Sequence, residues 1–152
     1  MDDFAARFRP EFAAMVREHA NRAPGFVTLV GLSVEEYGPG TVRCRLPHRP
    51  EIDNSMGSVH GGAIAALIDH TLSLAVYPLV EPCVWVATTN MSVQYLHPVR
   101  AGDTFADGTV VSLGSRQAVV RVEVTNAGRT VAVAVGGVMV RARETAQPGA
   151  GT

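Results

Sequence analysis

The sequence contains no lysine, so all thirteen of its basic residues are arginines. Fourteen acidic residues balance them, and the formal net charge is -1. Nucleic-acid-binding proteins normally show a basic patch or a high isoelectric point, and this composition has no such signature. Arginine also offers planar, bidentate donors for anions, although most of these arginines are expected simply to face solvent. We therefore predict no nucleic-acid partner.

Cysteine is also scarce. Cys44 and Cys83 are the only two, and both lie in apolar segments, which favours reduced, buried thiols over a disulfide framework. The opening MDDFAARFRPEF lacks the basic stretch and apolar core of a secretory signal, and no uninterrupted apolar run reaches the roughly 18 residues expected of a membrane span. These absences predict a cytoplasmic protein without a membrane partner.

Several catalytic motifs are missing as well. The sequence has no G-x-S-x-G nucleophile elbow, no phosphate-binding loop and no H-E-x-x-H pair. Its five histidines do not fall at metal-ligand spacing, so we predict no metal site. At 152 residues the chain fits one compact domain.

The order of hydrophobic patterns predicts an α+β domain. Residues 2–20 carry an apolar stripe at helical spacing, interrupted at Pro10, and this pattern predicts an N-terminal helix. Residues 26–47 alternate and predict two strands around a turn at residues 37–40, with Arg43 and Arg45 on the solvent side. Residues 60–78 predict a long apolar helix.

Four further runs, rich in valine and threonine, predict strands over residues 84–96, 104–113, 117–125 and 130–142. Short turn signals between them predict an antiparallel meander with hairpin connections. The simplest architecture is a long central helix wrapped by a curved antiparallel sheet of about six strands, plus an N-terminal helix. We divide the chain into an N-terminal helical extension (1–25), the main domain (26–143) and a disordered tail (144–152).

The run HGGAIAALID, from His60 to Asp69, is the most informative part of the chain. Its middle residues are all apolar, so we expect a helix buried nearly all round, where a charge is costly unless it has a partner or a task. A structural explanation of Asp69 is a buried carboxylate held by an arginine or by backbone amides. The functional explanation is a catalytic carboxylate, because perturbed charges cluster at active sites.

Gly61 and Gly62 begin this helix, where the first N–H groups lack acceptors and the helix dipole is positive. Without side chains they let a carbonyl approach the amides, as oxyanion stabilisation in acyl transfer requires. The alternative is that both glycines merely allow tight packing.

Asp69 follows Gly62 by seven residues, which places both on about the same helix face but roughly 10 Å apart along the axis. One chain therefore cannot bring both to one carbonyl. If they cooperate, a second copy of the helix must run antiparallel beside the first, so that two equivalent sites form by two-fold symmetry. Ala65 and Ala66, near the midpoint, would permit this close approach.

The stretch NSMGSVHGGAIAALIDHTLSLA, residues 54–75, resembles the hotdog-fold thioesterases of the phenylacetate-pathway (PaaI-like) type. The similarity continues through VATTNMSVQYLHPVRAGD and covers about residues 26–142. The resemblance implies a hotdog fold, a homodimer with active sites at the interface and a tetramer of two such dimers. It implies an acyl-CoA thioesterase that needs no cofactor, since coenzyme A is part of the substrate.

Matched to that family position by position, Asp69 is the catalytic carboxylate, acting as general base or as nucleophile, and Gly62 supplies the amide that polarises the thioester carbonyl. Asn54 helps to place water or substrate. Thr88 orients the water, unless a shift of one residue puts Thr89 there instead.

Other assignments from the resemblance are less direct. His60 either hydrogen-bonds near the thioester or orders the loop as a cap, and the ordering role is slightly favoured. Gly61, Ser115 and Arg116 are assigned to coenzyme A binding, the latter two from the turn at residues 114–116. His70 departs from the family, where a small or neutral residue is common, and helical geometry predicts that it faces away from the site.

Two other functions remain open at this point. A non-catalytic protein that binds acyl-CoA or another small ligand would share the same fold. Enoyl-CoA hydration is less consistent with the sequence, because Asp53 and His60 have the wrong spacing for the Asp and His pair of those enzymes. The acyl group is also open, since four large residues could line an acyl tunnel or belong to the core: Tyr77, Trp85, Met91 and Leu96.

Overall fold

The computed structural model describes residues 3–142, so the tail predicted over residues 144–152 lies outside the described part. Three short helices come first: α1 (Phe4–Arg7), α2 (Pro10–Arg22) and α3 (Phe26–Val30). The long helix is α4 (Gly61–Val76), preceded by the 3-10 turn η1 (Pro50–Ile52) and followed by η2 (Tyr77–Leu79). The strands are β1 (Ser33–Gly38), β2 (Thr41–Leu46), β3 (Val84–Tyr95), β4 (Thr104–Leu113), β5 (Gln117–Asn126) and β6 (Arg129–Ala142).

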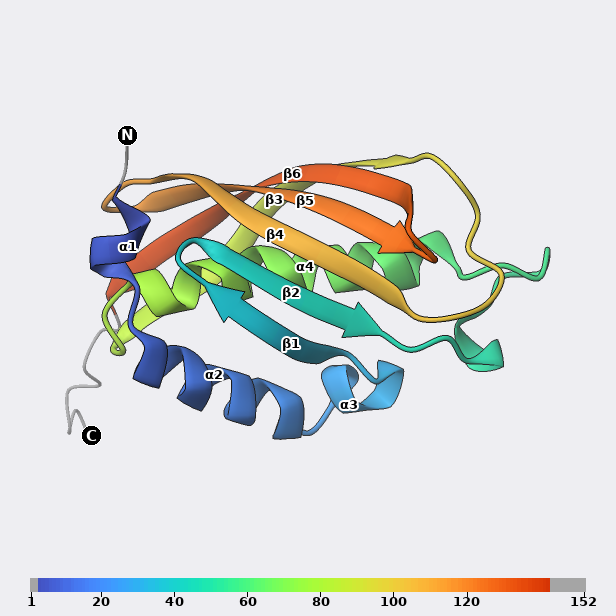
Figure 1. The fold of residues 1–152 in the computed structure, drawn as a ribbon, viewed down its shortest axis with the longest axis horizontal. Coiled ribbons are helices and arrows are strands. Elements are labelled where there is room, and N and C mark those ends of the chain that lie inside the picture. The colour runs from blue at the N-terminus through green and yellow to red at the C-terminus, as the bar shows by residue number, and fades with distance from the viewer. Residues whose placement is uncertain (1–2, 143–152) are drawn as a thin grey trace, which may run out of the picture.

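The six strands form one antiparallel sheet in the order β1-β2-β4-β5-β6-β3, and the sheet curves around α4 (Figure 1). Helix α4 contacts strands β2 to β6, and its sheet-facing side chains Leu67, Ile68 and Leu72 are fully buried. Gly136 permits this close packing, because a Cβ there would lie 2.5 Å from a methyl group of Leu72. The predicted central helix wrapped by six strands is confirmed.

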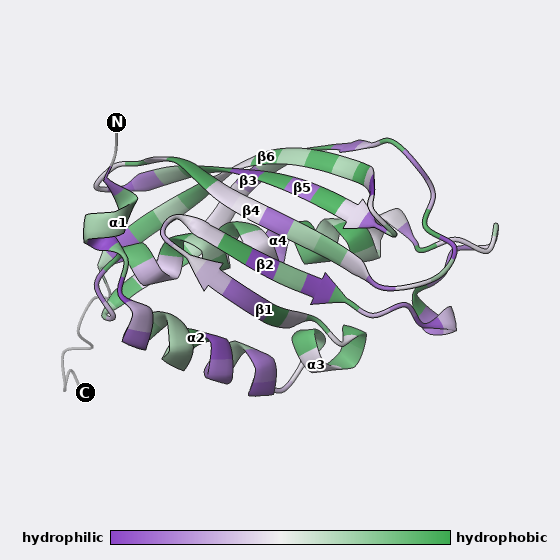
Figure 2. Ribbon diagram, in the orientation of Figure 1, coloured by the Kyte–Doolittle hydropathy of each residue, from purple (hydrophilic) through white to green (hydrophobic). Residues whose placement is uncertain are grey.

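The hairpin of β1 and β2 has the predicted alternation, which Figure 2 shows along β2. The inward side chains are all buried: Val42, Cys44 and Leu46. On the outer face Arg43 pairs with Asp107 at 3.2 Å, and Arg45 pairs with Asp103 at 2.7 Å. Asp107 belongs to β4 and Asp103 directly precedes it. These ion pairs therefore join the neighbouring strands β2 and β4 on the solvent side.

The prediction that the first strand begins at Phe26 is wrong. Residues 26–30 form the helical segment α3, and β1 begins only at Ser33. Gly25 and Gly31 bracket α3 with positive φ angles of 102° and 78°, which glycine adopts at little cost. A five-residue apolar run has too few positions to distinguish a helical turn from a strand by its periodicity.

The predicted four-strand meander is only partly correct. Strands β4, β5 and β6 are joined by consecutive hairpins, but β3 pairs with β6 and lies at the far edge of the sheet. The segment between β3 and β4 therefore crosses the end of the sheet and is not a hairpin. Alternation fixes which face of a strand is buried, but it does not identify the strand beside it.

One prediction about composition also needs correction. Cys44 is buried, and burial raises the pKa of its thiol to about 12, but Cys83 is exposed. The helical segment of residues 61–79 is long and apolar enough for a membrane span, with a mean hydropathy of 1.3, although polar residues interrupt its apolar run. The sheet curves around α4, and most apolar side chains of α4 and η2 belong to the hydrophobic core, which accounts for this hydropathy. The cytoplasmic location stays a prediction.

The two edges of the sheet differ. At the β1 edge, the side-chain oxygen of Asn21 accepts from the Val34 N–H at 2.7 Å, and its amide group donates to the Val34 carbonyl at 3.0 Å. Arg17 also donates to this carbonyl at 3.1 Å. Helix α2 thus satisfies backbone groups of β1 that would otherwise be open to another strand.

The β3 edge has no such cover. Within residues 3–142 no strand pairs with its outer side. Large side chains on this 12-residue strand are exposed: Trp85 by 48%, Met91 by 38% and Tyr95 by 52%. Long apolar edge strands tend to pair with another chain unless they are blocked. The β3 edge is therefore suited to pairing with a second copy.

Candidate active site

One face of α4 is open. Gly62 and Asp69 are exposed on it, and Ala66 and Ser73 are half-buried between and beyond them. The expectation of a helix buried nearly all round is therefore wrong for this chain, in which eight side chains of α4 are buried. We call the strip formed by Gly62, Ala66, Asp69 and Ser73 the open face. Its residues are small, which makes it suitable for close contact with another helix.

The Asp69 side chain makes no hydrogen bond or ion pair within residues 3–142. Among the described residues, neither an arginine nor a set of backbone amides holds it, so the structural explanation of Asp69 has no support there. Its carboxylate is available to a ligand or to a second chain. The Asp69 carbonyl receives a long hydrogen bond of 3.5 Å from the Thr88 hydroxyl.

At the helix start, His60 is the N-cap residue, and its Nδ1 accepts from the Gly62 N–H at 2.8 Å. The Gly61 carbonyl accepts from the Tyr95 hydroxyl at 2.9 Å. A Cβ on Gly62 would lie 2.9 Å from the His60 ring, and one on Gly61 would lie 3.4 Å from the Tyr95 ring. Both glycines thus have a packing role. The Gly61 N–H makes no hydrogen bond within the described residues.

Asn54 orders the loop before the helix. Its amide group donates to the Ser58 hydroxyl at 3.0 Å, and its side-chain oxygen accepts from the Met56 N–H at 2.9 Å. Asn54 and Gly61 line a cavity of about 300 Å³ together with Ile64, Tyr95 and His97 among others. The structure therefore brings two of the predicted residues together at the N-terminal end of α4.

Thr88, rather than Thr89, faces α4. The Thr88 hydroxyl lies 3.1 Å from the Ser73 hydroxyl, whereas Thr89 donates to the Gly137 carbonyl at 3.1 Å beside a bulge in β3. Ser73 is a neighbour of the site that the sequence analysis missed. The available signal was a hydroxyl four residues after Asp69, on the same face of an apolar helix.

Ser115 and Arg116 lie far from the helix start. The turn between β4 and β5 adjoins Leu79 and Val80, which follow the C-terminal end of α4. Because α4 has 16 residues, its two ends are about 24 Å apart. Within one chain the predicted coenzyme A residues Gly61 and Ser115 are thus at opposite ends.

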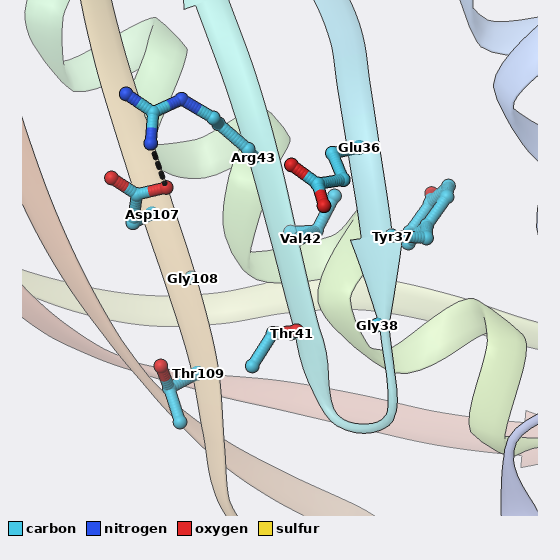
Figure 3. Close-up of a pocket in the computed structure, with 9 residues that line it drawn as sticks. All are labelled: Glu36, Tyr37, Gly38, Thr41, Val42, Arg43, Asp107, Gly108 and Thr109. Carbon is cyan, nitrogen blue, oxygen red and sulfur yellow. Dashed lines mark hydrogen bonds and ion pairs between the residues drawn. The ribbon is translucent and has the colours of Figure 1, made fainter.

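A separate depression of about 260 Å³ is lined by residues of β1, β2 and β4, and Figure 3 shows these residues. Its charged side chains include Arg43 and Asp107, which neutralise each other in an ion pair. None of the predicted site residues lines it. We therefore place the candidate active site on the open face and at the helix start.

His70 lies beside Asp69, but its environment differs. Burial lowers the pKa of His70, the charge of Asp69 opposes this shift only in part, and Nε2 is buried without a hydrogen-bond partner. As the pH falls, the unfolded chain therefore takes up the proton first. The contribution of the neutral His70 to the free energy of unfolding is therefore fully present above the ordinary histidine pKa of about 6.5. It decreases as the pH falls below this value, by up to about 1.4 kcal/mol per pH unit.

Urea unfolding at pH 7.5 and pH 5.5 tests whether His70 causes this pH dependence of the unfolding free energy. We expect His70→Gln to show a smaller loss of unfolding free energy between the two pH values than the unaltered protein. His19→Gln, at an exposed position of α2, should leave the loss unchanged. An equal loss in His70→Gln and the unaltered protein would contradict the assignment.

A long helix wrapped by a six-stranded antiparallel sheet is the hotdog fold. Among solved structures, the E. coli PaaI protein from the phenylacetic acid degradation operon superposes with a TM-score of 0.76 at 21% identity, covering 88% of this chain and 96% of that one. A conserved protein of Pseudomonas aeruginosa also gives 0.76, at 29% identity, covering 82% and 98%.

The sequence model of the thioesterase superfamily matches residues 56–133, and the chain belongs to this family of thioester hydrolases. A Halobacterium salinarum protein that bears a provisional esterase name is 36% identical over 123 residues, which are 78% of this chain and 80% of that protein. Human acyl-coenzyme A thioesterase 13 is 27% identical over 128 residues, covering 83% and 87%. The resemblance to PaaI-like thioesterases is thereby confirmed.

Proposed function

We propose that the protein hydrolyses acyl-coenzyme A at two equivalent sites of a homodimer, each with Asp69 from one chain and the amides of the α4 start from the other. The observation that carries this proposal is the shared exposure of Gly62 and Asp69 on the open face. Their separation of roughly 10 Å along one helix is too large for one carbonyl. Two antiparallel copies of the helix would place Gly62 of each chain beside Asp69 of the other, which gives two equivalent sites.

The open β3 edge supports the same dimer. Thr88 of β3 contacts Ser73 of α4, so the strand edge and the open face are adjacent. A second chain that pairs with β3 about a two-fold axis would also place its own α4 beside this one. The contact would cover Met91 and Tyr95, which are exposed in the single chain.

The tetramer of two dimers expected from the resemblance remains part of this proposal. Support comes from apolar side chains exposed on the strands away from the helix: Val111, Val133 and Val135. On β6, two of these valines alternate with the buried residues Ala132 and Ala134, so they belong to the outer face of the sheet.

For hydrolysis, the thioester carbonyl would accept hydrogen bonds from amides at the α4 start, where the helix dipole favours developing negative charge. The Gly62 N–H can take part once the His60 ring releases it, and the Gly61 N–H is a second donor without an internal acceptor. Asn54 beside this point would help to position the substrate.

Asp69 of the other chain would then act as general base. It removes a proton from water while the water oxygen bonds to the carbonyl carbon, and the proton passes to the departing thiolate as the carbon–sulfur bond breaks. As a nucleophile, Asp69 would instead attack the carbonyl carbon and expel the coenzyme A thiolate as the carbon–sulfur bond breaks, and water would then hydrolyse the resulting acyl anhydride to the free acid and the Asp69 carboxylate. Thr88, whose hydroxyl contacts the Ser73 hydroxyl and the Asp69 carbonyl, would orient the water.

A coloured thiol assay with a panel of aliphatic, branched and aromatic acyl-CoAs tests the proposal. We expect free coenzyme A to be released in multiple turnovers from at least one of them. Tight binding of acyl-CoA without release of thiol would instead favour the non-catalytic ligand-binding protein that has kept the fold.

A further inference from the structure

A cavity of about 430 Å³ lies near the C-terminal end of α4, away from the helix start. It is formed by segments far apart in the sequence, because α1 lies beside the turn between β4 and β5 (Figure 1). Six of the residues around it matter here: Arg7, Arg9, Leu79, Val80, Gly114 and Ser115.

Polar contacts attach the N-terminal segment to this cavity. The Arg9 N–H donates to the Pro78 carbonyl at 3.1 Å, and the Arg9 guanidinium donates to the Val80 carbonyl at 2.9 Å and pairs with Glu81. The Arg7 guanidinium donates to the Leu113 carbonyl at 3.2 Å, directly before the turn. The segment is therefore held in a defined position at the wall of the cavity.

The charges around the cavity favour an anion. Glu81 is its one lining carboxylate, and Arg9 neutralises it. Arg7 makes no ion pair with a carboxylate within residues 3–142, and neither does Arg116, which follows Ser115 in the turn. A guanidinium binds phosphate oxygens through parallel hydrogen bonds, and a serine hydroxyl can add a further donor.

The distance between the cavity and Asp69 also fits the binding of coenzyme A. Leu79 follows Asp69 by ten residues, so the cavity lies about 15 Å along the helix axis from the carboxylate of the same chain. In an acyl-CoA the extended pantetheine arm separates the sulfur from the phosphates. When the thioester is bound at Asp69, the phosphates therefore need a cationic site that lies one pantetheine arm away. The cavity beside Arg7 is such a site, and it belongs to the same chain as Asp69.

We propose that Arg7 binds phosphate groups of coenzyme A together with Ser115 and Arg116. The N-terminal segment is then part of the substrate-binding site and not only an extension of the domain. This inference rests on the proposed function, because it takes the leaving group to be coenzyme A. Arg7 acts on binding of the leaving group and not on the chemical step.

The first test compares KM for one acyl group carried by coenzyme A and by pantetheine, which lacks the phosphates. Arg7→Gln should raise KM for the acyl-CoA about tenfold, as expected for losing hydrogen bonds to a charged group, with kcat unchanged. KM for the acyl-pantetheine should not change. Arg7→Lys should recover part of the loss, because it keeps the charge without the bidentate geometry.

Arg22→Gln is the matched control, since Arg22 is an exposed arginine at the far end of α2, paired with Glu18 on its own helix. It should leave KM unchanged for both substrates. An equal rise of KM for both substrates in Arg7→Gln would show a purely structural role, and no rise for either would show no role. Both results overturn the inference.

A second test uses the unaltered full chain and does not depend on hydrolysis or on the folding of a variant. Adenosine 3′,5′-bisphosphate, which carries phosphates without a thioester, is titrated while amide and arginine side-chain N–H resonances are followed by NMR. We expect saturable shifts at Arg7, Gly114 and Ser115. Absence of saturable shifts there, or shifts confined to the α4 start, overturns the inference. Failure of the thiol assay alone would overturn the proposed function but not this binding result.

Discussion

Replacing Asp69 with Asn is expected to lower kcat for the best acyl-CoA by about three orders of magnitude, with little change in KM. Asparagine keeps the size of the side chain but cannot accept a proton from water or attack the carbonyl. General-base catalysis typically contributes a factor of about 10² to 10⁴, and no other carboxylate is present on the open face. Steady-state kinetics with thiol detection measures the effect.

Asp107→Asn provides a matched control, because it makes the same chemical change on the outer face of the sheet. It removes an ion pair with Arg43 whose two side chains are each about 40% exposed, and such surface pairs contribute at most about 1 kcal/mol. Its kcat should equal that of the unaltered protein. If Asp69→Asn hydrolysed the substrate at the original rate, the catalytic role of this carboxylate would be wrong.

Ala66→Arg is expected to make the protein monomeric and to lower kcat/KM at least about 100-fold. Ala66 lies between Gly62 and Asp69 on the open face, where the proposed dimer leaves room only for small side chains. An unpaired charge enclosed between two helices costs several kcal/mol. Within one chain Ala66 is only half-buried, so the monomer should remain folded.

Sedimentation velocity and the thiol assay together measure this second effect, and circular dichroism verifies the fold. Ala14→Arg is the control, since Ala14 is exposed on α2 away from the open face. It should stay dimeric and active. A monomeric Ala66→Arg with full activity would show that one chain suffices for catalysis.

The sequence predicted the central helix and the strand runs because their patterns are local. Helix α4 is a long apolar run that starts at two glycines and ends before Pro78, and Val42 and Cys44 alternate with outward arginines, so each element could be recognised from its own residues. The position of β3 beside β6 depends on contacts between distant segments, which no local pattern records. Residues 26–30 were misread because the run is short.

The candidate site was predictable in its residues but not in all its contacts. The spacing of Gly62 and Asp69 gave their common face, and the structure shows both exposed there. The bond from Gly62 N–H to His60, and the proximity of Ser73 to Thr88, depend on side-chain orientation. The contact of Arg7 with the carbonyl of Leu113 spans 106 positions, and no motif in either segment indicates it.

Mixing two inactive variants tests most directly whether two chains share each site. Asp69→Asn lacks the base, and Gly62→Val places a side chain over the amides at the helix start. After joint unfolding and refolding of equal amounts, half of the dimers should be mixed, and each mixed dimer should contain one intact site. We predict recovery of about a quarter of the unaltered activity. If the mixture is no more active than the two variants assayed separately, Asp69 and Gly62 do not act across two chains.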